Sequence, residues 1–120
     1  MKSDGKGISQ LVTLGISELD LQKKIETRNG EFVIKALFPY EKTYVIKLIA
    51  EQAGNISNLF IAEAEYVRKI CTLQVCIVEN PDWWVGASNC LDDDLLNHIY
   101  EEYLKLEDSL SEKLKKNRPN

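Results

Sequence analysis

The sequence contains few of the residues from which catalytic and metal sites are built. It has one histidine, His98, and three cysteines, with no C-x-x-C or H-x-x-x-H pair. Structural zinc sites use such closely spaced thiolates and imidazoles, and a nucleophilic catalyst needs an adjacent base that a third group orients. The sequence around His98 shows neither closely spaced metal ligands nor a nucleophile with an oriented base. We therefore expect a chain that is not an enzyme, with no catalytic residues, no metal, no cofactor and no small-molecule substrate.

The sequence also lacks a long apolar segment and an excess of positive charge. No apolar run approaches the about 20 residues that a helix needs to span a bilayer, and the polar start does not resemble a secretory signal. Asp and Glu number 19 against 15 Lys and Arg, for a net charge of −4. Nucleic-acid domains concentrate positive charge instead. We expect a cytoplasmic protein with no membrane partner and no nucleic-acid partner.

Cysteine usage and composition indicate one reduced globular domain. Cys71, Cys76 and Cys90 form an odd set in a chain large enough to fold without disulfides. Cys71 and Cys76 would point about 140° apart on a helix, which favours core thiols over ligands of one ion. With 44% hydrophobic and 28% charged residues, the composition is typical of a single domain over residues 1–120.

The N-terminal half predicts a flexible arm followed by a β-hairpin. Residues 1–12 are rich in glycine and serine and show no clear period, which indicates an arm. Over residues 17–38, alternation places Leu19, Leu21 and Ile25 on one strand face. Asn29-Gly30 favours a type I′ turn before a β-rich second strand. A two-stranded ribbon is marginal alone, so one face must pack on other elements.

The remaining chain predicts a helical core over residues 41–112. The first helix covers about 41–53, and the second starts near Ser57 or Asn58 and extends to about Glu79. Its end, 71–78, is β-branched enough to form a strand, so both assignments stay open. The last helix begins at Asp92, which can cap it, and has a heptad-like apolar stripe of Leu96, Ile99, Tyr103, Leu106 and Leu110. The predicted fold class is α+β, with an N-terminal β-hairpin packed on a mainly α-helical domain of about three helices.

Two adjacent tryptophans are the most unusual feature of the loop before the last helix. Trp83 and Trp84 follow a Pro-Asp turn, and exposed aromatic side chains are common anchors in protein interfaces. Packing of one or both over the helix ends is the alternative, because a tryptophan buries about 150–250 Å². Our hypothesis is a partner-binding surface formed by Trp83, Trp84, Tyr100 and Tyr103.

Several segments resemble small bacteriophage tail assembly chaperones and baseplate assembly proteins. The similar segments are Gly30 to Lys42, with its Leu-Phe-Pro-Tyr-Glu run, Ile70 to Leu73, Pro81 to Trp84, and the acidic Leu91 to Tyr103. The resemblance implies a non-enzymatic protein that binds a tail or tape-measure component in the host cytoplasm during virion assembly. The alternative is a structural virion subunit, such as a baseplate, connector or tail component. Either role implies phage structural proteins as partners, and self-association into a homo-oligomer stays open.

Overall fold

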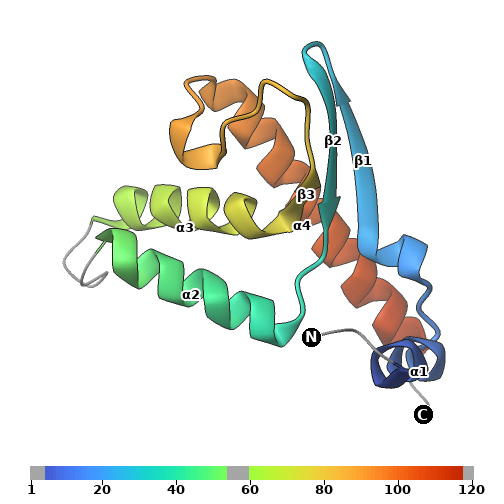
Figure 1. Cartoon of the computed structure of the whole chain (residues 1–120). Coiled ribbons are helices and arrows are strands. Elements are labelled where there is room, and N and C mark those ends of the chain that lie inside the picture. Colours follow the sequence, from blue (N-terminus) through green and yellow to red (C-terminus); the bar gives the residue numbers. More distant parts are fainter. Residues whose placement is uncertain (1–4, 54–59, 118–120) are drawn as a thin grey trace.

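The computed structural model describes residues 5–53 and 60–117, which form an α+β fold (Figure 1). A three-stranded antiparallel sheet has the order β1-β2-β3. The sheet packs on helices as predicted, although the described residues form four α-helices rather than three. The elements in chain order are α1 (Gly5–Leu14), η1 (Glu18–Leu21), β1 (Gln22–Thr27), β2 (Gly30–Lys35), α2 (Pro39–Ala53), α3 (Ile61–Cys76), β3 (Ile77–Glu79), η3 (Ala87–Asn89) and α4 (Asp93–Lys116).

The predicted hairpin is present, but its turn differs from the prediction. Thr27 pairs with Gly30, so the turn residues are Arg28 and Asn29. Among the described residues only glycines have a positive φ, so Asn29 does not adopt the conformation of a type I′ turn. Gly30 instead occupies the first position of β2 with φ +138°. A glycine is needed there because its backbone lies in a region that side chains disfavour.

The first strand is also shorter than predicted. Residues Glu18–Leu21 form the 3₁₀ turn η1, in which Leu19 is exposed and does not share the strand face. A capping box explains this turn, because Ser17 Oγ accepts from the Asp20 N–H at 3.2 Å and Asp20 Oδ2 accepts from the Ser17 N–H at 2.8 Å. Within β1, Ile25 is buried as expected.

Helix α2 starts where the sequence places a proline. Pro39 occupies the first helical position, which has no need of a backbone donor. Glu41 accepts from the Phe38 N–H at 2.9 Å and pairs with Lys35 Nζ at 2.6 Å. These contacts fix the direction in which the chain leaves the sheet, and α2 then packs along α3.

The ambiguous segment 71–78 contains both a helix and a strand. α3 ends at Cys76 rather than at Glu79, and Ile77–Glu79 form β3 beside β2. Ile70, Cys71, Leu73 and Cys76 are buried, so the second half of α3 contributes to the core. The expected start of this helix at Ser57 or Asn58 lies outside the described residues. At the observed start of α3, Glu63 accepts from the Phe60 N–H at 3.1 Å.

Helix α4 follows its predicted pattern closely. Asp92 Oδ1 accepts from the Leu95 N–H at 3.1 Å, which confirms the predicted cap. The apolar stripe faces the core, with Leu96 and Ile99 fully buried and Leu110 half-buried. Lys23 of β1 forms an ion pair with Glu102, so α4 is tied to the inner face of the hairpin. In Figure 1, α4 runs from the loop that follows β3, past the sheet, to the neighbourhood of α1.

The expected arm contains a helix, α1, that ends in a defined cap. The Gly15 N–H donates to Val12 O at 3.1 Å and the Ile16 N–H donates to Leu11 O at 2.9 Å. With Gly15 at φ +73°, these bonds form a Schellman motif, and Ile16 is buried beyond it. None of the described helices combines the length and apolar character that a membrane crossing requires.

Candidate partner-binding surface

The two tryptophans pack against the hairpin. Trp84 is half-buried and meets Phe32 edge-on, with ring centroids 5.0 Å apart. Trp83 also meets Phe32 edge-on at 6.1 Å, and its indole N–H donates to Asn29 O at 2.6 Å. Because 45% of Trp83 stays exposed, its outer surface is available to a partner although its position is fixed. The pair therefore holds the turn of the hairpin.

Tyr100 and Tyr103 lie on the side of α4 that faces the core. Their rings stack with centroids 6.2 Å apart. Tyr103 is only 6% exposed, and its hydroxyl donates to Glu107 Oε2 at 2.6 Å. Burial, and then the Glu107 carboxylate, raise the pKa of Tyr103, while burial raises that of Tyr100. Tyr103 is thus a core residue, and the structure does not bring these tyrosines together with Trp83 and Trp84 into one exposed surface.

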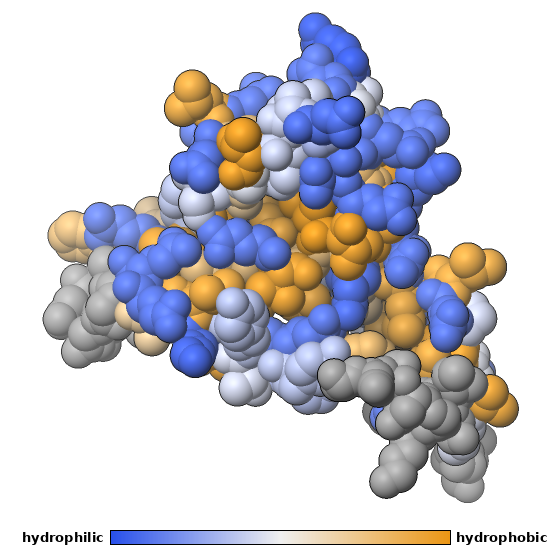
Figure 2. Space-filling view, viewed as in Figure 1, coloured by the Kyte–Doolittle hydropathy of each residue, from blue (hydrophilic) through white to orange (hydrophobic). Residues whose placement is uncertain are grey.

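A different part of the molecule carries an open cleft. It lies between the end of α1, η1, the start of α2 and the distal half of α4, and its volume is about 480 Å³. This volume is within the range of about 300–1,000 Å³ that ligand sites occupy. Most of the lining side chains are apolar: Leu11, Leu14, Ile16, Leu21, Leu37, Phe38, Pro39, Leu110 and Leu114. Figure 2 shows apolar side chains gathered around α1 and the neighbouring end of α4, apart from a second group over α3.

One carboxylate joins this cleft to the core. Glu107 Oε2 accepts from the Leu37 N–H at 3.3 Å as well as from Tyr103. Its other oxygen lies 3.8 Å from Lys42 Nζ at the cleft wall. Asp108, also in the lining, forms no ion pair with a described residue. The cleft therefore contains one carboxylate, Glu107, that bonds to other residues of the chain and one, Asp108, that is available to pair with a bound cation.

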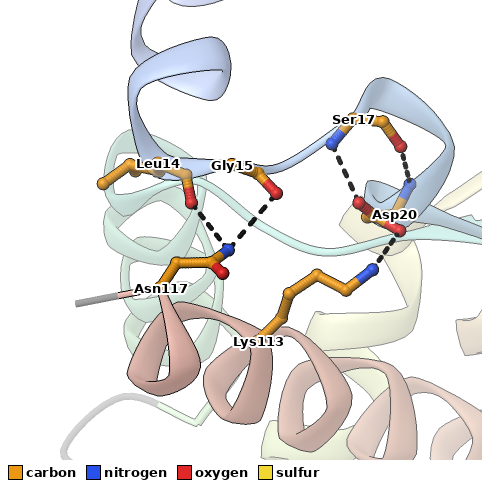
Figure 3. Close-up of polar contacts among 6 residues, drawn as sticks. All are labelled: Leu14, Gly15, Ser17, Asp20, Lys113 and Asn117. Carbon is orange, nitrogen blue, oxygen red and sulfur yellow. Dashed lines mark hydrogen bonds and ion pairs between the residues drawn. The ribbon is translucent and has the colours of Figure 1, made fainter. Parts of the chain in front are cut away.

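Polar contacts fasten the end of α1 to the end of α4 (Figure 3). Asn117 Nδ2 donates to Leu14 O at 3.1 Å and to Gly15 O at 3.4 Å. Lys113 Nζ lies 2.9 Å from Asp20 Oδ1. The Lys113 bond, followed by the Ser17 N–H, lowers the pKa of Asp20 to about 2. These contacts join α1 and η1 to α4, the elements that form opposite walls of the cleft.

The other chemically reactive residues do not form a site. Cys71 and Cys76 are buried, and burial raises the pKa of both thiols, that of Cys76 to about 12. His98 is exposed on α4. Within the described residues no three His, Cys, Asp or Glu side chains lie together as ligands for a metal ion.

The sequence interpretation missed the cleft because its lining comes from both ends of the chain. Leu11 and Leu14 are three residues apart, a helical spacing in a segment that otherwise resembles an arm. Ile8, Leu11 and Val12 add the helical spacing i, i+3 and i+4. Comparison with protein-family models, with curated proteins and with solved structures found no match to this chain.

Proposed function

We propose that this chain is a non-enzymatic assembly chaperone for a bacteriophage tail component and that it holds an apolar helical segment of that component in the α1–α4 cleft. The observation that supports the proposal most strongly is the cleft itself, which is open and lined mainly by apolar side chains, six of them leucine. Open apolar grooves of this kind accept one face of an amphipathic helix. The class of client is proposed from the resemblance of short segments, such as Gly30 to Lys42, to phage tail assembly chaperones.

The charge at the cleft supports a client helix with a basic residue beside its apolar stripe. Glu107 and Asp108 lie in the lining with a single cation, Lys42, whose ammonium group is near Glu107. A lysine or arginine of the client can therefore pair with Asp108. Such a rim pair contributes more to the association rate and its salt dependence than to affinity.

Variants on two walls of the cleft test this role. Leu14 is 39% exposed and Leu114 is half-buried, so lysine at both positions changes the cleft without opening the main core. The control is Leu104→Lys, which places the same charge on a 45% exposed site of α4 outside the cleft. Each variant is co-expressed with the products of the neighbouring genes. Overlapping peptides of the captured protein then provide dissociation constants by fluorescence anisotropy.

We expect the double variant to weaken client binding by about 30-fold or more, since loss of a central apolar contact is worth ~2 kcal/mol. Leu104→Lys should bind like the unchanged chain. Equal dissociation constants for the unchanged chain, the double variant and Leu104→Lys would contradict binding in the cleft. Presence of the protein in purified virions at fixed stoichiometry would instead identify it as a structural subunit, because a chaperone leaves before maturation.

A further inference from the structure

The outer edge of strand β1 has unused backbone hydrogen-bonding groups. Among the strands of the described residues, β1 has a neighbour on one side only, β2. The Ala36 N–H donates to Leu21 O at 2.7 Å, and Thr27 pairs with Gly30 across the turn, so odd-numbered residues of β1 bond to β2. The N–H and C=O groups of Lys24 and Glu26 therefore point away from β2. Figure 1 shows the hairpin projecting beyond the helices with β1 on its outer side.

The charges on the outer face of this hairpin are not balanced within one chain. Glu26 lies directly opposite Glu31 on β2. Like charges in that position destabilise a strand pair. Lys24 on the same face pairs with Glu31, with its Nζ 3.6 Å from Glu31 Oε2. Glu26 forms no ion pair with a described residue. A cation supplied from the free edge would relieve this repulsion.

We propose that a second copy of this chain pairs through its own β1, antiparallel and centred on Ile25, to form a continuous six-stranded sheet. In this register Lys24 of each copy lies opposite Glu26 of the other, and these two residues direct their backbone groups at each other. The two Ile25 residues meet on the helix-facing side. The proposal does not depend on the chaperone function, because the β1 edge contributes no residue to the cleft.

Charge selects this register over its neighbours. The alternation of side chains allows only shifts that keep both inner faces on one side of the joined sheet. Centring the pair on Lys24 places two lysines opposite each other. Centring it on Glu26 opposes two glutamates and sets Lys24 against Arg28. Lysine on an edge strand ordinarily discourages pairing. Here Glu26, two residues after Lys24, lies opposite the Lys24 of the other copy only in the register centred on Ile25.

Charge reversal tests the pairing without damaging the fold. Glu26→Lys opposes Glu31 within the hairpin, so the thermal midpoint of the monomer should not fall. In the dimer it opposes Lys24 of the other copy, and the dissociation constant should rise by about 100-fold or more because two symmetric like-charge pairs appear. Lys24→Glu should also dissociate the dimer. Glu31→Gln is the control, since it changes the same face away from the edge and should leave the dimer intact.

Two samples with complementary charges at the β1 edge should form the dimer again. The double variant Lys24→Glu with Glu26→Lys again presents opposite charges, and so does an equimolar mixture of the two single variants. Light scattering should give twice the 13.7 kDa mass of one chain for the unchanged protein, the control, the double variant and the mixture. Hydrogen exchange at the Lys24 and Glu26 amides should be slow only in these samples. A monomeric unchanged protein, or a Glu26→Lys variant that remains dimeric, would overturn the proposal.

Discussion

Alanine at Gly30, compared with alanine at Gly86, measures how firmly the tryptophan loop holds the hairpin. Both glycines have a positive φ, +138° at Gly30 and +101° at Gly86. A Cβ atom at Gly30 would lie 2.5 Å from Pro81 Cγ and 2.9 Å from Pro81 Cβ. A Cβ atom at Gly86 would meet nothing within 4 Å. The two substitutions thus share backbone strain and differ in the collision with Pro81.

The strain at each position is worth about 1–3 kcal/mol, because alanine disfavours these backbone angles. Gly30→Ala must in addition displace Pro81, which precedes the two tryptophans. The contacts of Phe32 with Trp83 and Trp84 then loosen, and aromatic pairs of this kind contribute about 0.5–1.5 kcal/mol each beyond their buried area. We expect Gly30→Ala to destabilise the protein by ~1–3 kcal/mol more than Gly86→Ala.

Urea unfolding followed by circular dichroism and by tryptophan fluorescence checks this difference. An excess of 1 kcal/mol corresponds to roughly 3–6 °C in the thermal midpoint of a chain this size. The native fluorescence of Gly30→Ala should also move to longer wavelength, because water reaches the indoles, whereas that of Gly86→Ala should not. Equal losses of stability, with equal spectra, would refute the view that the loop packs tightly on the turn.

Three further predictions concern single groups. Glu107→Leu should destabilise the protein by ~1–3 kcal/mol in urea unfolding, because the Tyr103 hydroxyl loses its acceptor at 2.6 Å, while Glu107→Gln keeps an acceptor and should lose less. Of the three cysteines only Cys90 should react rapidly with a thiol reagent in the native protein, since the other two are buried, and all should react in urea. The Asp20 carboxyl should titrate by NMR near pH 2, and Lys113→Met should raise that midpoint toward 3.8. Because the folded pKa is depressed, the Lys113 contact stabilises the protein above about pH 4 and is lost as the pH falls toward 2.

Sequence patterns predicted the elements that are stabilised by contacts between residues close in sequence. The stripe of α4 and the Asp92 cap follow from spacing within one helix, and the hairpin follows from alternation around a short turn. The turn type was wrong because Gly30 is taken into the strand, where its backbone passes close to Pro81 from a distant loop. Asn29 therefore accepts from Trp83 instead of adopting a positive φ.

Tertiary contacts decided the elements that sequence patterns left open or missed. Residues 77–79 leave the helix because β2 offers an antiparallel partner, so the β-branched run divides at Cys76. The cleft joins Leu11 near the start of the chain with Leu114 near its end. No window of local sequence contains both walls, and the helical spacing of Ile8, Leu11 and Val12 is short. Trp83 and Trp84 are rare residues in this sequence, yet both rings pack edge-on against Phe32 in the same chain.

Helix α4 links the two surfaces proposed for this chain. Glu102 forms the ion pair with Lys23 of β1, and Glu107 lies in the cleft five residues further along the same helix, about 7.5 Å along the axis. Pairing through β1 would therefore create a dimer with two rigidly connected clefts. A client with two apolar segments would gain from the high effective concentration of the second cleft, although each contact alone stays weak enough to release. Glu26→Lys should consequently weaken capture of a whole client with two segments while leaving the affinity of a single-segment peptide unchanged, which separates the contribution of pairing from that of the cleft.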